Sequence, residues 1–329
     1  PSRGLGDVYK RQGGTFIASE LEKRLADFKH SESALVFNTG YMTNLGVLYG
    51  LMQTGDVVFS DELNHASIID GCRISRCKVV VYKHNDMADL QRLLETEIVT
   101  GQRFIVTDGV FSMDGDIADL PSLAVLKKQF NACLIVDDAH GVGVIGNDGS
   151  GTASHYGLTD VIDLQVGTLS KALAAEGGYV AGKKILIDYL INRSRPFIFS
   201  TALAPATLAA ANAALLLLQT QASKYLDSLR ANSRLMRRLL LEGGLNVVEG
   251  ITPIIPVVIG EAGLTMQFAD RLKSKGILVS GIRPPTVPRG ESRLRITVTA
   301  AHCEEQLRQA AQIITALWQE LKHGEKKEG

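Results

Sequence analysis

The 329-residue sequence has little of several features that mark specialised classes of protein. Lysine and arginine together number 35, as do aspartate and glutamate, so no net field favours nucleic acid or an anionic membrane surface. No apolar run reaches the roughly 18 residues that suggest a membrane-spanning helix. The richest stretch, residues 208–218, is interrupted by Asn212. We therefore expect neither a nucleic-acid partner nor insertion into a membrane.

Cysteine is also scarce. Structural metal sites use closely spaced ligands, and the spacings here fit none of the usual patterns: Cys72, Cys77, Cys133 and Cys303. So few cysteines predict a reduced, cytoplasmic environment and no metal site. What the sequence does have is an ordinary globular composition, 45% hydrophobic and 21% charged, over a length that predicts two domains.

The first twelve residues, Pro1 to Gln12, differ from the rest of the chain. They have no initial methionine, no apolar core like that of a signal peptide, and no helical or strand periodicity. We expect residues 1–12 to be a non-native or artefactual segment. The remaining chain is expected to divide into a large domain over residues 13–222 and a small C-terminal domain over residues 223–329.

From Gly13 onward, short apolar segments alternate with segments of helical periodicity. Strands are expected at residues 34–37, 57–59, 79–82, 104–107 and 132–136 and just before Thr168, with helices at 19–28, 41–51, 66–75, 87–97, 120–130 and 185–193. Strands that are apolar on both faces and alternate with helices predict a mainly parallel sheet covered by helices. A long helical stretch, stopped by Gly243 and Gly244, then leads into a smaller α+β domain.

Polar residues follow the ends of five of these strands. Taken singly, each has an ordinary explanation as a helix cap, a turn residue, a satisfied histidine or a surface lysine. The carboxyl ends of parallel strands, however, meet at one edge of a sheet, where ligands gather. Their convergence therefore predicts a ligand site made from Gly40 with Tyr41, His65, Ser112, Asp137 with His140, and Thr168 with Lys171.

The chemistry of this set fits pyridoxal 5′-phosphate (PLP). Lys171 has little packing reason to follow a buried strand, and a lysine there suits a Schiff base with the cofactor's aldehyde. Asp137 is placed to keep the ring nitrogen protonated, which makes the ring an electron sink. His140 can hydrogen-bond the phenolic oxygen, and His65 or Tyr41 can stack on the ring face. The sequence thus predicts PLP as the cofactor.

The phosphate of PLP needs backbone N–H groups and hydroxyls. The expected helix start at Gly40 and Tyr41, with the hydroxyl of Thr168, suits it. A dinucleotide fits less well, because Gly141 and Gly143 lack a properly spaced third glycine and do not lie in a first strand-to-helix turn.

Five segments together resemble the α-oxoamine synthases, fold-type I PLP enzymes that condense an amino acid with an acyl thioester and release CO₂. The resemblance runs from about Gly13 to Lys322, and the segments occur in the family's order: Gly40-Tyr41, residues 60–71, 108–115, 136–141 and 167–171. It implies a fold-type I PLP-dependent transferase, with a mainly parallel central sheet covered by helices and a smaller C-terminal α+β domain.

The resemblance also implies roles for single residues. Lys171 would carry the cofactor and later move protons at the substrate Cα, with Asp137 on the ring nitrogen and His140 on the phenolic oxygen. His65 would stack over the ring and help the thioester carbonyl to react. Ser112 and Thr168, with Gly40 and Tyr41 at the phosphate end, would complete the cofactor site.

Further implied contacts concern the substrate and a second subunit. Arg295 would clamp the carboxylate of the amino acid, for which a bidentate guanidinium has the right shape, and Thr286 would be a second substrate contact. Ser200 and Thr201 would reach the phosphate bound by the neighbouring subunit, which implies a homodimer with shared active sites.

Within the family, residues 195–202, 282–288 and 293–302 most resemble members that condense L-alanine with a pimeloyl thioester, on CoA or acyl carrier protein, in biotin biosynthesis. The alternative is glycine C-acetyltransferase, which differs before the final arginines. The family also has several dozen residues before the position of Gly13, including an arginine thought to contact substrate, and a histidine within the segment matching residues 14–19. These departures leave a third possibility, a truncated PLP-binding dimer without turnover.

Overall fold

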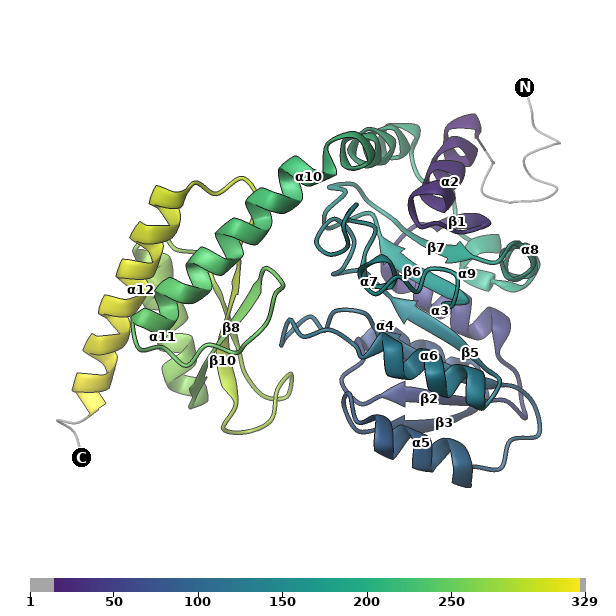
Figure 1. Cartoon of the computed structure of the whole chain (residues 1–329), viewed down its shortest axis with the longest axis horizontal. Helices are drawn as coiled ribbons and strands as arrows, with labels where there is room; N and C mark the ends of the chain where they lie inside the picture. The colour runs from purple at the N-terminus through teal and green to yellow at the C-terminus, as the bar shows by residue number, and fades with distance from the viewer. Residues whose placement is uncertain (1–14, 326–329) are drawn as a thin grey trace. The chain divides into compact units, whose positions relative to one another are not determined.

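The chain folds into two compact units, described here from a computed structural model over residues 15–325. The expected non-native segment, residues 1–12, lies outside the described residues. One unit contains residues 15–111 and 117–222; the other contains residues 112–116 and 223–325 (Figure 1). Among the helices of residues 15–325, none combines the length and the apolar character needed to cross a membrane.

The first unit is built on a seven-stranded sheet with the order β1-β7-β6-β5-β4-β2-β3. All its strands run parallel except β7, which is antiparallel to β1 and β6. This arrangement confirms the prediction of a mainly parallel sheet. The strands are β1 (Ser33–Phe37), β2 (Val57–Asp61), β3 (Lys78–Tyr82), β4 (Arg103–Asp108), β5 (Ala132–Asp137), β6 (Leu164–Thr168) and β7 (Gly178–Gly182).

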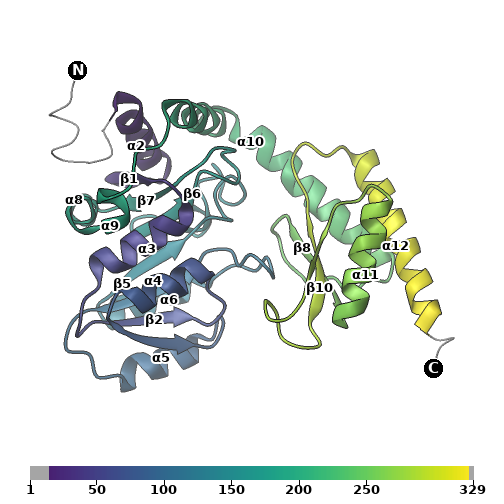
Figure 2. The same cartoon turned by 180° about the vertical axis from the view of Figure 1, so that it is seen from behind.

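Helices cover both faces of this sheet, as the views in Figures 1 and 2 show. One face packs against α3 (Gly40–Leu51), α4 (Ala66–Ile74), α8 (Lys184–Arg193) and α9 (Arg195–Ile198). The opposite face packs against α2 (Phe16–Phe28), α5 (Met87–Thr96), α6 (Leu120–Gln129), α7 (Thr152–His155) and the first part of α10 (Pro205–Glu242).

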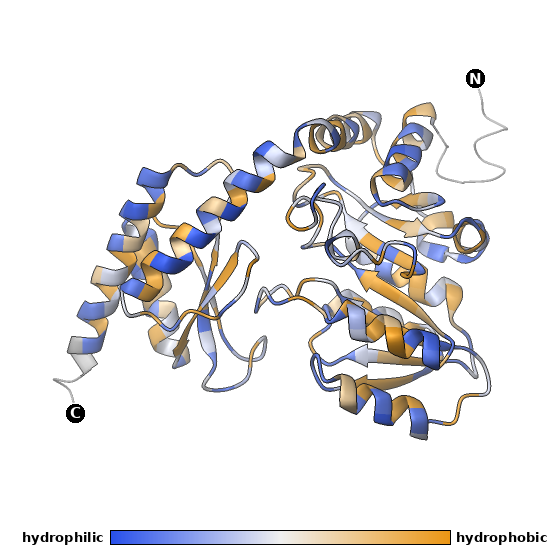
Figure 3. Cartoon of the chain, in the orientation of Figure 1, coloured by the Kyte–Doolittle hydropathy of each residue, from blue (hydrophilic) through white to orange (hydrophobic). Residues whose placement is uncertain are grey.

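The two-sided cover explains why the inner strands carry buried apolar residues on both faces. Consecutive strand residues point to opposite faces, so Val58 and Phe59 are both buried but belong to different hydrophobic clusters. The same holds for Leu134 and Ile135 in β5. Figure 3 shows β5 in orange, whereas α2 and α6 carry both orange and blue residues.

The sequence-based expectations missed some short elements: β7, α7, α9 and β9 (Ser280–Ile282). In β7 the sequence Gly-Tyr-Val-Ala-Gly carries two terminal glycines, which weaken any strand signal. Gly178 is needed there because a Cβ would lie 2.7 Å from the N and Cα atoms of Gly40. The helix expected at residue 19 begins instead at Phe16, since the side chain of Thr15 accepts a hydrogen bond from the N–H of Ala18 and caps it.

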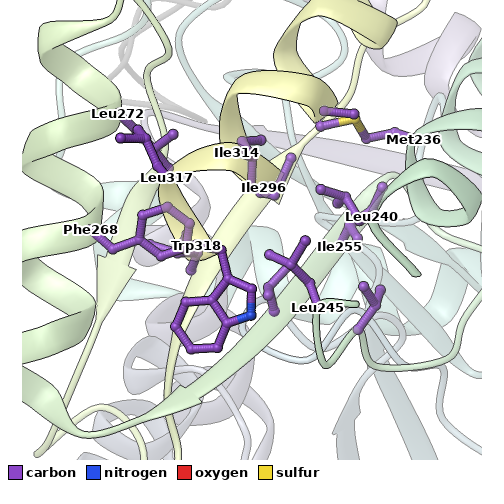
Figure 4. Close-up of a cluster of buried hydrophobic side chains, with 14 of the residues drawn as sticks. Met236, Leu240, Leu245, Ile255, Phe268, Leu272, Ile296, Ile314, Leu317 and Trp318 are labelled. Atoms are coloured by element: carbon purple, nitrogen blue, oxygen red, sulfur yellow. The ribbon is translucent and has the colours of Figure 1, made fainter. Parts of the chain in front are cut away.

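The second unit has the smaller α+β fold that was predicted. Its antiparallel sheet has the order β8-β10-β9, with β8 at Ile254–Gly260 and β10 at Ser292–Thr297. It packs against α11 (Ala262–Ser274), α12 (Glu304–Glu325) and the second part of α10, which is interrupted at Gln221. Trp318 stacks on Phe268 in this core, with ring centroids 5.7 Å apart (Figure 4).

Candidate functional site

One edge of the first unit's sheet carries most of the predicted residues. Asp137 is the last residue of β5 and lies in register with Asp108, the last residue of β4. Thr168 ends β6, and Lys171 follows three residues later with its side chain exposed. His140 is half-buried in the turn after β5. The parallel sheet therefore brings these groups to one edge.

Asp137 is held from two sides. Its Oδ2 accepts a hydrogen bond from Asn44 Nδ2 at 2.6 Å, and its Oδ1 accepts one from the N–H of Ala139 at 3.0 Å. Asp137 is 6% exposed and Asn44 3%. The alternative that Asp137 caps a helix is excluded, because the residues after it form a turn.

Asn44 is a residue that the sequence analysis missed. It lies on α3, 93 positions from Asp137, and its second partner is Ser67 Oγ on α4, at 2.9 Å. The only sequence signal was a lone amide among the small and apolar residues of the segment 40–51. Such a buried amide must find hydrogen-bond partners, but the sequence does not say which.

His65 occupies the N-cap position of α4. Its Nδ1 accepts a hydrogen bond from the N–H of Ser67 at 3.2 Å and lies 2.7 Å from Ser67 Oγ. Its own N–H donates to Asp108 Oδ2 at 2.8 Å. The helix-start explanation for His65 is therefore right, and the same contacts link it to the carboxyl groups at the sheet edge.

Asp108 gives this edge an unusual electrostatic character. Burial, followed by the negative charge of Asp137, raises the pKa of Asp108 well above its usual value. The hydrogen bond from the N–H of His65 and the positive charge of Lys171 act in the opposite direction. Asp137 and the exposed Lys171 thus act in opposite directions on one buried carboxyl group, a pattern that is common at functional sites.

The start of α3 and the end of β6 form a second polar cluster. Thr39 caps α3 by accepting a hydrogen bond from the N–H of Met42 at 3.1 Å. Thr168 Oγ1 lies 2.7 Å from Ser170 Oγ and accepts a hydrogen bond from the N–H of Ser170 at 3.2 Å. A Cβ on Gly40 would lie 3.4 Å from Thr168 Oγ1. Helix N–H groups and hydroxyls therefore lie close together, as an anionic group requires.

Tyr41 also lies at the start of α3, but its hydroxyl is engaged with a neighbouring helix. It donates a hydrogen bond to Asp70 Oδ2 at 2.5 Å, and this contact raises the pKa of Tyr41.

Residues 200 and 201 lie beside the same helix start. Asn38 Nδ2 donates to the carbonyl of Thr201 at 2.7 Å, and Ser200 Oγ lies 4.0 Å from Met42 Sδ. Both predicted residues therefore belong to the surroundings of the α3 N-terminus within their own chain.

The remaining predicted residues belong to the second unit. Arg295 on β10 donates from Nε to the carbonyl of Ser112 at 2.5 Å and from Nη1 to Thr297 Oγ1 at 3.1 Å, and burial lowers its pKa. Thr286 is exposed in the connection between β9 and β10. The structure therefore joins Ser112 to Arg295, and places Ser112 outside the first unit.

The donor set fits PLP better than a metal. Within residues 15–325, no group of three or more histidine, cysteine or acidic side chains is arranged to hold a metal ion. The first unit offers instead a lysine, a buried carboxylate with donors on both oxygens, and a helix start beside two hydroxyls. These match the carbonyl, ring nitrogen and phosphate of PLP.

Comparison with known proteins gives consistent results. Residues 3–314 match the model of the family described as aminotransferase class I and II. The 8-amino-7-oxononanoate synthase of Geobacter sulfurreducens is 52% identical, over 97% of this chain and 82% of that protein. The Francisella tularensis 8-amino-7-oxononanoate synthase structure superposes with a TM-score of 0.80 at 31% identity, covering 95% of this chain and 90% of that one. A structure of SPT with a PLP internal aldimine gives 0.91 at 31% identity, covering 95% and 79%.

Proposed function

The chain belongs to the aminotransferase class I and II family and, within it, to the 8-amino-7-oxononanoate synthases, and on this premise we propose that it condenses L-alanine with a pimeloyl thioester. The products are 8-amino-7-oxononanoate, CO₂ and the free thiol, and the pathway is biotin biosynthesis. It is a PLP-dependent acyltransferase that acts on an amino acid and an acyl donor. The observation that carries the proposal is a lysine and a buried, doubly held carboxylate at one sheet edge in a chain of this family.

The cofactor contacts are assigned to residues at that edge. Asp137 pairs with the ring nitrogen, His140 with the phenolic oxygen, Lys171 with the carbonyl carbon, and His65 lies against the ring face. When bound, PLP supplies an electron sink that stabilises negative charge at the amino-acid Cα. The hydrogen bonds that Asp137 receives from Asn44 and Ala139 support its role, because they fix the position and plane of the carboxyl group that would face the ring nitrogen.

The phosphate is assigned to the polar cluster at the start of α3. The N–H groups of Gly40 and Tyr41 lie in the first helical turn, where backbone donors have no intrahelical acceptor. Thr168 adds a hydroxyl. Ser112 is assigned to the cofactor site by the family resemblance alone.

The chain's own groups then bind the substrates and move protons. Lys171 takes the proton from the alanine Cα and later returns one there. Arg295 binds the alanine carboxylate; its two hydrogen bonds use two of the five guanidinium N–H donors and fix the plane of the group. His65 donates a hydrogen bond to the thioester carbonyl oxygen, and Thr286 is a second substrate contact.

We also assign a homodimer with shared sites. Ser200 and Thr201 lie beside the start of α3, so in a symmetric dimer that packs on this region the pair from each chain would reach the phosphate site of the other. Sedimentation of the PLP-bound protein at micromolar concentration checks this: a dimer is expected, and a monomer that still turns over contradicts the shared site.

The reaction is tested by thiol release with two substrate pairs. The purified protein is given L-alanine with pimeloyl-CoA or pimeloyl-acyl carrier protein, and separately glycine with acetyl-CoA. Thiol release with the alanine pair and formation of 8-amino-7-oxononanoate are expected. Release with the glycine pair alone identifies a glycine C-acetyltransferase, and cofactor absorbance without thiol release from either pair identifies a PLP-binding protein without turnover.

The assignment of Lys171 has its own test. Borohydride reduction of the PLP-bound protein should attach the cofactor covalently to the peptide that contains Lys171, as peptide mass spectrometry detects. Lys171→Ala should abolish both the labelling and the turnover. Labelling of any other lysine contradicts the assignment.

A further inference from the structure

A buried chain of hydrogen bonds runs from Asp137 to His65 through two residues that have no assigned role. Asn44 Nδ2 lies 2.6 Å from Asp137 Oδ2 and 2.9 Å from Ser67 Oγ. Ser67 Oγ in turn lies 2.7 Å from His65 Nδ1. Asn44 and Ser67 are 3% and 1% exposed, so water does not substitute for these contacts. These hydrogen bonds connect Asp137, the partner of the ring nitrogen of PLP, with His65, the residue on the ring face.

We propose that Asn44 and Ser67 are positioning residues for catalysis. Asn44 holds the carboxylate of Asp137 for the ring nitrogen, and Ser67 holds the His65 ring with Nδ1 as hydrogen-bond acceptor and Nε2–H as donor. This inference rests on the function proposed above, because it deepens the roles assigned there to Asp137 and His65.

The direction of every hydrogen bond in the chain follows from its donors. The carboxylate of Asp137 only accepts, so the amide nitrogen of Asn44 must face it, and the second N–H of that nitrogen donates to Ser67 Oγ. The backbone N–H of Ser67 donates to His65 Nδ1 at 3.2 Å. A backbone N–H cannot accept, so Nδ1 carries no proton, and the Ser67 hydroxyl donates to it as well.

The hydrogen bonds orient both Asp137 and His65 for the roles assigned to them. Asp137 keeps a donor on each oxygen, which fixes the carboxylate plane. His65 presents Nε2–H as a hydrogen-bond donor, the form that stabilises charge growing on a thioester carbonyl oxygen. The other charged groups facing this chain are Asp108, which accepts from the N–H of His65 at 2.8 Å, and Lys171, whose charge acts on Asp108.

The tautomer is tested directly on the cofactor-free protein. The protein is labelled with ¹⁵N-histidine, and long-range ¹⁵N–¹H correlation spectra distinguish Nδ1–H, Nε2–H and doubly protonated rings. The His65 signals are those lost in His65→Gln. A ring with a proton on Nε2 and none on Nδ1 is expected. A proton on Nδ1 of His65 overturns the proposal, whatever the enzyme's activity.

Two variants test the two ends of this series of hydrogen bonds separately. Asn44→Ala removes a hydrogen bond to a charged group, so kcat should fall about 10- to 100-fold, and the pH dependence of the PLP absorption band should change. Ser67→Ala removes a neutral hydrogen bond to His65 but leaves Asp137 and Asn44 in contact. Here kcat should fall about 3- to 10-fold with the same absorption band.

The matched control is Ser75→Ala. Ser75 is also buried, 3% exposed, at the end of the same helix. Its Oγ donates to the carbonyl of Cys72 at 2.6 Å and lies 3.0 Å from Cys77 Sγ, so its contacts are with residues outside the predicted site. Its kcat should match that of the unsubstituted enzyme. A Ser67→Ala variant with kcat like that of the control, or an Asn44→Ala variant with an unchanged absorption band, overturns the positioning roles.

Failure of the proposed function has a different signature. If the unsubstituted protein releases no thiol with alanine and a pimeloyl thioester, the synthase assignment fails. The tautomer of His65 and the effect of Asn44→Ala on the PLP band are measured without any turnover, so they still decide the positioning proposal.

Discussion

Replacing Lys29 by methionine should strongly destabilise the first unit. Lys29 Nζ lies 2.8 Å from Asp138 Oδ2, with side chains 0% and 1% exposed, and it also donates to the carbonyl of Ser150. Methionine keeps the apolar stem but removes the ammonium group. Asp138 then stays buried without its ion-pair partner, and the carbonyl of Ser150 loses a donor.

The expected magnitude follows from that burial. Removing one partner of a buried ion pair costs about 3–5 kcal/mol. The backbone packs directly on this carboxylate, because Gly151 has φ +111° and a Cβ there would lie 1.7 Å from Asp138 Oδ2. Asp138 keeps Thr152 as a donor, through Oγ1 at 2.9 Å and the N–H at 3.1 Å, which compensates only part of the loss.

A double variant removes both charges. In Lys29→Met with Asp138→Asn, the asparagine oxygen still accepts from Thr152, and no buried charge remains. The double variant should therefore cost only about 1–2 kcal/mol, the net worth of one or two neutral hydrogen bonds. The double variant should therefore be about 1–4 kcal/mol more stable than Lys29→Met alone, which is the difference between the two expected costs.

Urea unfolding with two probes measures these values. Far-UV circular dichroism follows the whole chain, whereas fluorescence of Trp318, the single tryptophan, follows the second unit. Lys29→Met should shift the dichroism midpoint more than the fluorescence midpoint, because Lys29 belongs to the first unit. The control is Lys78→Met, which breaks the more exposed pair with Glu97 and should cost less than about 1 kcal/mol.

Two results would refute this reasoning. One is a cost for Lys29→Met no larger than that of Lys78→Met. The other is a double variant whose cost equals the sum of the two single costs, since the charges would then not interact.

Three further predictions concern the site and the thiols. Burial and then Asp137 raise the pKa of Asp108, so the stability that its carboxyl group contributes is present below about pH 4 and is lost as pH rises through the raised pKa. In urea unfolding of the cofactor-free protein from about pH 4 to 8, the Asp108→Asn variant should therefore lose less stability than the unsubstituted protein. Parallel stability curves for the two proteins would contradict the raised pKa. Arg295→Lys should raise KM for alanine about tenfold and leave KM for the thioester unchanged, since lysine cannot bind a carboxylate bidentately; equal increases in initial-rate assays would argue against a carboxylate clamp. Ellman's reagent should modify Cys303 first, because Cys303 is exposed, whereas burial raises the pKa of Cys72 to about 12. A fast phase of modification that survives Cys303→Ser would disprove this order of reaction.

The sequence by itself determined the architecture of the first unit. Segments apolar on both faces, alternating with amphipathic ones, leave a helix-covered parallel sheet as the arrangement that buries them. In such a sheet Asp137, Thr168 and Lys171 must reach the same edge, since each follows a parallel strand. The polar groups of the site were therefore recognisable as a set, and the order of the segments indicated the family.

Only the tertiary structure decided the partners of these groups. Asn44 and Asp137 are 93 residues apart, Lys29 and Asp138 are 109 apart, and no local pattern marks either pair. The strand β7 was also invisible, because its pairing with β1 and β6 supplies the stability that its own sequence lacks. Propensity and periodicity are local properties, whereas a buried polar group is satisfied by whichever donor the folded chain brings to it.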